Sequence, residues 1–124
     1  EAIEAGVAMV MVSTASYPNL GAKKQAAFSP AIVQRLLRDE LGFDGVVVTD
    51  DLDAPAVTSV TPPGLAAANA LKAGDDLLLY AGSDAASAQA FGSLVSQVKR
   101  GSLDREPIEE AYGRITSLKE SLSG

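Results

Sequence analysis

The sequence of 124 residues contains no cysteine and no histidine. The lack of cysteine excludes disulfides, thiolate nucleophiles and cysteine-based metal sites from this chain. The lack of histidine excludes a Ser-His-Asp relay, an imidazole base and a histidine metal ligand. The chain by itself therefore cannot supply several of the commonest hydrolytic and metal centres.

Long apolar runs and clustered basic residues are also missing. No apolar run approaches the roughly 20 residues that a bilayer crossing requires, and no signal-peptide pattern is present. The net charge is −6 and the acidic residues are scattered, whereas nucleic acids and anionic membranes need clustered Lys and Arg. With 47% hydrophobic residues the chain can bury a core, and we expect residues 1–124 to form one domain. We expect no nucleic-acid partner and no membrane-spanning segment.

Apolar runs and helical patterns alternate along the chain. Residues 7–12, 45–49 and 77–80 are continuously apolar rather than alternating, which predicts strands of a parallel sheet buried on both faces. Helices are predicted at residues 29–41, 61–73, 85–100 and 107–122, with Ser29 as an N-cap and Gly42, Gly74 and Gly101 as stops. The fold class is therefore α/β with right-handed crossovers. Residues 17–28 are predicted to form a turn and a long connection.

Asp50 follows the valine-rich strand directly, at its carboxyl end. It is either a catalytic carboxylate or a turn residue that accepts backbone hydrogen bonds. For Asp51, the structural interpretation as a turn or capping carboxylate is favoured. A metal site made by Asp50, Asp51 and Asp53 is disfavoured, since the spacing lacks the Gly and the bidentate Glu of a calcium loop. We expect neither a metal nor a cofactor.

The segment 41–52, LGFDGVVVTDDL, resembles the nucleophile region of family 3 glycoside hydrolases, most closely that of the bacterial β-N-acetylhexosaminidase branch. Further similar motifs extend over nearly the whole chain: Ala5-Gly6-Val7, Met11-Val12-Ser13, Tyr17-Pro18, Phe28-Ser29, Ala73-Gly74 with Asp76, and Arg114-Ile115 with Lys119. The resemblance implies the C-terminal portion of a (β/α)8 barrel, about three β/α units of parallel strands with flanking helices.

The resemblance also implies roles for particular residues. Asp50 would be the nucleophile of a retaining glycosidase that forms a covalent glycosyl-enzyme on terminal β-linked N-acetylhexosamine. Ser13, Thr14 and Asp51 would lie on the same rim, as secondary candidates for substrate binding. The acid/base group of such enzymes, an Asp-His dyad or a Glu, lies outside this chain, so we expect the chain alone to be inactive. Thr14 stands where relatives commonly have His.

Other functions stay open at this point. A β-glucosidase specificity within the same family is the nearest alternative to the hexosaminidase. A doubly wound nucleotide-binding domain is the least favoured, since no strand–helix junction carries a glycine-rich phosphate loop.

The third alternative is a non-catalytic partial barrel, because three strands with two open edges are a poor independent unit. The chain begins without Met, on residues 1–6 that resemble the tail of a helix. We therefore expect a piece of a longer protein that self-associates or contacts the rest of a barrel. An accessible Asp50 would favour the enzyme, and burial of Asp50 in a capping network would favour the structural role.

Overall fold

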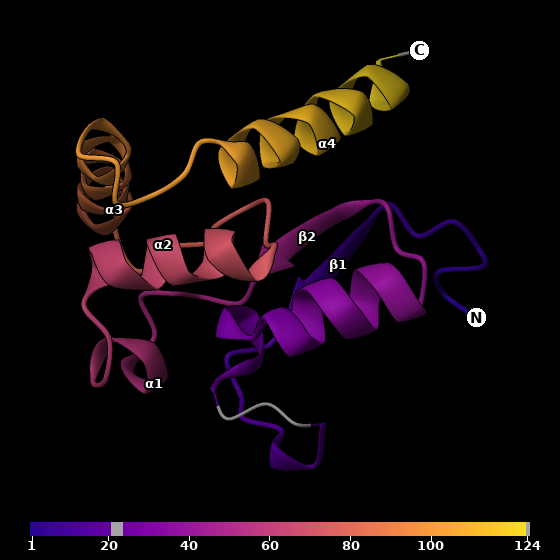
Figure 1. Cartoon of the computed structure of the whole chain (residues 1–124), viewed down its shortest axis with the longest axis horizontal. Coiled ribbons are helices and arrows are strands. Elements are labelled where there is room, and N and C mark those ends of the chain that lie inside the picture. The colour runs from indigo at the N-terminus through magenta and orange to yellow at the C-terminus, as the bar shows by residue number, and fades with distance from the viewer. Residues whose placement is uncertain (21–23, 124) are drawn as a thin grey trace.

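The computed structural model describes residues 1–20 and 24–123 (Figure 1). Residues 21–23, which belong to the predicted connection 17–28, lie outside that part. In chain order the elements are β1 (Met9–Val12), the 3-10 turns η1 (Pro18–Leu20) and η2 (Ala26–Phe28), the helix η3 (Ala31–Glu40), β2 (Val46–Thr49), and the helices α1 (Pro55–Thr58), α2 (Pro63–Ala73), α3 (Asp84–Lys99) and α4 (Glu106–Leu122). Among the described residues no helix combines the length and the apolar character that a membrane crossing needs.

In the described part of the chain the sheet is parallel, as predicted, but it has two regular strands rather than three. β1 and β2 pair in a register that places Met9 opposite Val46. The predicted strand at residues 77–80 runs beside β2 but makes only one ladder pair, between Val48 and Leu77. Beyond Leu77 the Leu79 N–H donates to the hydroxyl of Thr49 (3.0 Å). Because a side chain takes this donor, no second ladder pair forms, although the Leu79 carbonyl accepts the Leu52 N–H (2.9 Å).

Only one face of the sheet is covered along its whole length. η3 and α2 pack with the sheet around a core that includes Val12, Val47 and Leu52, which are all buried. On the other face Met11 is 57% exposed, and Met9, Leu77 and Leu79 are also exposed. The prediction that residues 7–12 and 77–80 are buried on both faces is therefore wrong. No element of the described part of the chain lies over these side chains.

The predicted helices are all present, with small shifts at their ends. The alanines of α2 are buried, and their small side chains allow close packing against α3 and η2. Gly42, Gly74 and Gly101 each have a positive φ, which confirms them as helix stops. Ser29 does not cap η3 with its side chain, since the helix begins at Ala31 and the Ser29 carbonyl accepts the first N–H groups instead. η3 is wound as a π-helix, and η1, η2 and α1 were not predicted.

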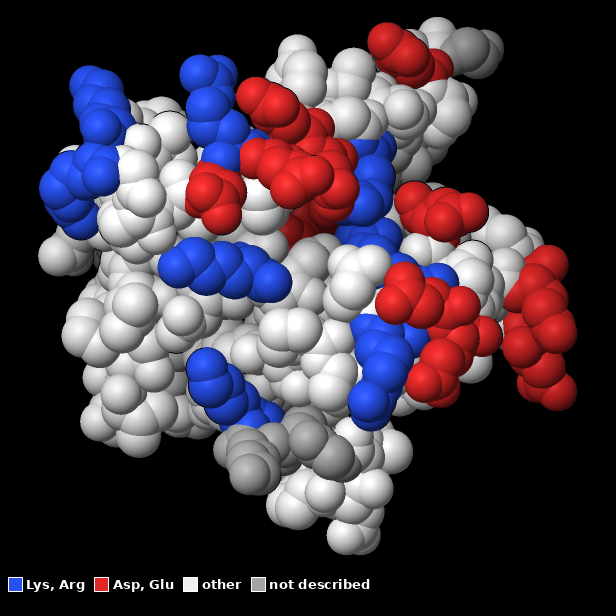
Figure 2. Space-filling model, viewed as in Figure 1, with Lys and Arg blue, Asp and Glu red and all other residues white. Residues whose placement is uncertain are grey.

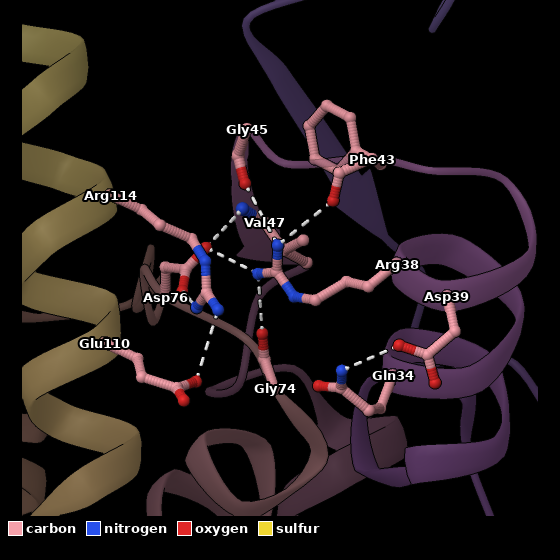
Figure 3. A network of polar contacts seen from close by, with 10 residues as sticks. All are labelled: Gln34, Arg38, Asp39, Phe43, Gly45, Val47, Gly74, Asp76, Glu110 and Arg114. Atoms are coloured by element: carbon pink, nitrogen blue, oxygen red, sulfur yellow. Dashed lines mark hydrogen bonds and ion pairs between the residues drawn. The ribbon is translucent and has the colours of Figure 1, made fainter.

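A buried ionic network joins three elements at the amino end of the strands (Figure 3). The Asp76 carboxylate accepts from Arg38 of η3 (2.8 Å), from Arg114 of α4 (2.9 Å) and from the Val47 N–H (2.8 Å). Arg38 also donates to the Gly74 carbonyl (2.9 Å). The Asp76 side chain is 1% exposed, so these bonds are shielded from water. The network fixes η3 and α4 against the start of β2.

Candidate functional site

Asp50 lies directly after β2, where the sequence predicts the candidate catalytic group. Its backbone N–H donates to the Val12 carbonyl at the end of β1 (2.9 Å). One carboxylate oxygen, Oδ1, accepts the N–H of Asp51 (2.8 Å), and the residue is half-buried. No described residue donates to Oδ2, so one oxygen of this carboxylate remains available to a reacting group.

Asp51 faces a different environment from its neighbour. Its Oδ1 accepts the N–H of Asp53 (2.9 Å) and the N–H of Ala81 (3.0 Å). This is the turn-stabilising use of an Asp side chain that the sequence favours for Asp51, here extended to a segment 30 residues further along the chain. Direct substrate contact by that oxygen would compete with both bonds.

Ser13 and Thr14 follow β1, and both are half-buried. The Ser13 hydroxyl accepts the N–H of Ala15 (2.9 Å), and the backbone carbonyl of Ser13 accepts the N–H of Ala27 (3.1 Å). Val12 pairs with Thr49 across the sheet, so the residues after β1 and β2 lie at the same end. The structure thus brings Ser13, Thr14, Asp50 and Asp51 together at the carboxyl end of the two strands.

Tyr80, on the segment beside β2, lies near Asp53 of the turn after β2. The Tyr80 hydroxyl donates to the Pro63 carbonyl (3.2 Å). Burial, and secondarily the charge of Asp53, raises the pKa of Tyr80 to about 12. Tyr80 therefore stays protonated over the working range of most hydrolases and anchors the segment to the start of α2.

Sequence reasoning did not identify Thr49 as part of this site. It is fully buried, and its hydroxyl joins β2 to the segment after Leu77 through the Leu79 N–H. A threonine at the end of a valine run gives only a faint signal, because the same residue type is common in any strand.

Neither of two surface cavities reaches Asp50. One, of about 630 Å³, lies at the amino ends of the strands against α4, between residues such as Asp44 and Ser117. The other, of about 550 Å³, is an apolar groove between α3 and α4 that includes Phe91 and Tyr112. Asp50 lies outside both of them, half-buried at the carboxyl end of β2.

Charged side chains are mixed over the face drawn in Figure 2. Acidic atoms gather over the first turns of α4, where Glu106 and Glu109 lie, and basic side chains flank them. On this face of the described chain the basic residues form separate clusters rather than one stripe. Among the described residues, no three acidic groups come together in a way that could hold a metal ion.

Comparison with known proteins gives one consistent result. Residues 1–118 match the family described as "Glycosyl hydrolase family 3 N terminal domain". A family 3 β-N-acetylglucosaminidase from a Paenibacillus species superposes with a TM-score of 0.90 and 36% identity, over 96% of this chain and 23% of that one. A β-N-acetylhexosaminidase from Beutenbergia cavernae gives a TM-score of 0.89 and 36% identity, over 95% of this chain and 35% of that one.

A third relative carries two activities in its name. It is the β-N-acetylglucosaminidase/β-glucosidase of Cellulomonas fimi, 32% identical over 98% of this chain and 23% of its own length. The chain thus spans between 23% and 35% of the length of these relatives. Its two parallel strands and their helices match part of the barrel domain in that family. The chain belongs to glycosyl hydrolase family 3.

Proposed function

We propose that this chain supplies the nucleophile-bearing part of a retaining glycoside hydrolase that acts on terminal β-linked N-acetylhexosamine. The observation that carries the proposal is the environment of Asp50. It lies half-buried at the carboxyl end of a parallel strand, with one oxygen held by the Asp51 N–H and no described donor on the other. In barrel enzymes this end of the strands carries the catalytic residues.

The chemistry follows from one free carboxylate oxygen. Asp50 Oδ2 attacks the anomeric carbon, the bond from that carbon to the leaving oxygen breaks, and a glycosyl ester forms on Asp50. An acid group about 5–5.5 Å from Asp50 protonates the leaving oxygen and then, as a base, activates water to cleave the ester. In this proposal that second group, an Asp-His dyad or a Glu, comes from protein outside this chain, which contains no histidine for such a dyad.

The test compares Asp50→Asn with Asp44→Asn in the gene product that contains this chain. Asp44 is exposed and precedes β2, so it is a matched control at the opposite end of the same strand. With an aryl N-acetyl-β-glucosaminide, we expect Asp50→Asn to lower kcat by at least about 10³-fold, since removing a nucleophile removes the covalent route. We expect Asp44→Asn to leave kcat unchanged.

A second readout identifies the reacting atom. A fluorinated N-acetylglucosaminyl donor, which forms the ester faster than water cleaves it, should leave a glycosyl adduct on the peptide that contains Asp50. Full activity of Asp50→Asn, or an adduct on another residue, would overturn the proposal. An aryl β-glucoside measured in parallel decides between the two specificities that the name of the Cellulomonas fimi relative combines.

A second candidate function is a non-catalytic partial barrel that assembles with other protein. The observation that favours it is the uncovered sheet face, where Met9 and Met11 are exposed beside an edge of β1 that has no strand partner among the described residues. If the gene product hydrolyses neither substrate and sediments as an assembly, this function replaces the hydrolase.

A further inference from the structure

The turn that follows β2 is held by an unbroken series of hydrogen bonds. The N–H groups of residues 49–53 all have acceptors. Thr49 and Leu52 donate to the carbonyls of Leu77 and Leu79 (both 2.9 Å), and Asp50 donates to the carbonyl of Val12 (2.9 Å). The turn is therefore tied on one side to β1 and on the other to residues 77–79.

Two of these five N–H groups depend on side chains rather than on backbone carbonyls. The Asp51 N–H donates to Asp50 Oδ1, and the Asp53 N–H donates to Asp51 Oδ1. The same Asp51 oxygen also accepts the Ala81 N–H (3.0 Å). One oxygen atom thus closes the turn on itself and joins it to the end of the neighbouring segment.

This arrangement fixes the direction of the peptide group between Asp50 and Asp51. Its N–H is the group that holds Asp50 Oδ1, and the bonds to Asp51 Oδ1 keep the turn from rotating. Without them the Asp50 side chain would lose its fixed orientation, and a displacement of about 1 Å at a reacting atom can cost about 10²-fold in rate.

We propose that Asp51 is a positioning residue for Asp50. It acts through its acceptor oxygen on the turn and on Ala81, and it does not bind the sugar. The inference rests on the proposed function, because it assumes that Asp50 is the nucleophile. It predicts that the acceptor oxygen at position 51 matters and that the negative charge there does not.

The test uses four variants in the gene product that contains this chain. Asp51→Ala removes the acceptor, Asp51→Asn removes the charge but keeps Oδ1, and Asp51→Glu keeps the charge but moves the oxygen. Asp44→Asn is the control, because it removes one negative charge from an exposed side chain at the opposite end of β2. The measured quantities are kcat, KM and the melting temperature.

We expect Asp51→Ala and Asp51→Glu to lower kcat by about 10²-fold with little change in KM. Asp51→Asn should retain kcat within about threefold, and Asp44→Asn should match the wild type. If Asp51→Ala does not fold, the contrast between Asp51→Glu and Asp51→Asn gives the same test.

Two results would overturn the inference. Wild-type kcat in both Asp51→Ala and Asp51→Glu would show that the bonds are dispensable. A raised KM in Asp51→Asn, with Asp51→Glu unaffected, would show that the charge of Asp51 contacts the sugar. Asp50→Asn, measured alongside, separates these outcomes from failure of the proposed function, since full activity there removes Asp50 as the nucleophile.

Discussion

The two ends of the sheet use the same residue type in opposite ways. At the amino end, the Asp76 side chain is 1% exposed and both of its oxygens accept bonds, from two arginines and a backbone N–H. At the carboxyl end, Asp50 is half-buried and accepts one described bond, on Oδ1. A fully bonded carboxylate can only hold structure, whereas one with a free oxygen can react. This division matches the separation of stability and catalysis between the two faces of barrel enzymes.

The largest expected effect on stability comes from breaking the amino end. Asp76→Ala should lower the free energy of unfolding by about 3–5 kcal/mol, because it leaves two arginines without their carboxylate, one of them almost fully buried. Asp50→Ala removes one local bond and should cost less than about 1 kcal/mol. Urea unfolding of both variants measures the difference. Equal losses of unfolding free energy in the two variants would mean that Asp76 contributes no more to stability than Asp50 does.

The environment of Asp76 could not be predicted from the sequence. Arg38 and Arg114 each lie 38 residues from Asp76, and no local pattern records which side chains meet across η3, α4 and the sheet. For the same reason the sequence could not show that residues 77–80 form no regular third strand. The Leu79 N–H donates to the Thr49 hydroxyl rather than to a backbone carbonyl, and these two residues lie 30 positions apart in the chain.

Local features were predicted far better. The valine run of β2, the glycines that end the helices and the position of Asp50 after a strand each depend on a few adjacent residues. The exposure of Met9 and Met11 could not be read in this way. An apolar strand has the same sequence whether or not another element covers its face, so the pattern cannot show that the cover is missing.

A pair of glycines offers a second way to test the comparison. At Gly45, an added Cβ would lie 2.6 Å from the Ala8 carbonyl oxygen, which accepts the Val46 N–H at the start of the β1–β2 pairing. The backbone would have to move, so Gly45→Ala should cost about 1–3 kcal/mol. At Gly82, the nearest neighbour is the Asp53 side chain, which can rotate away.

We therefore expect Gly82→Ala to cost less than about 1 kcal/mol. Thermal unfolding of the two alanine variants against the wild type gives both values. The expected difference between the two ends is wrong if Gly82→Ala lowers the stability more than Gly45→Ala does.

A smaller effect than the loss at Asp76 is expected at its neighbour, Asp75. Asp75 is 1% exposed and neither of its oxygens has a partner among the described residues. Burial, reinforced by the Asp76 charge and opposed by Arg38, raises the pKa of Asp75 from 3.8 to about 8. The folded protein therefore keeps this carboxyl protonated at pH values where the unfolded chain has ionised it.

The sign of the pH dependence follows from that difference. Below about pH 4 both states are protonated, so the stability associated with Asp75 is fully present. Between about pH 4 and 8 only the unfolded chain loses the proton, so stability falls as pH rises. Asp75→Asn cannot ionise and removes this loss. Because the buried amide also lacks partners, the net gain at pH 7 should be only about 1–2 kcal/mol.

Urea unfolding of the wild type and Asp75→Asn at pH 4.5 and 7.5 measures this effect. The advantage of the variant should grow between the two pH values. An advantage that stays constant with pH would mean that Asp75 is ionised in the folded protein. The amino end would then tolerate an unpaired buried charge, and the contrast with Asp50 would rest on the Asp76 ion pairs alone.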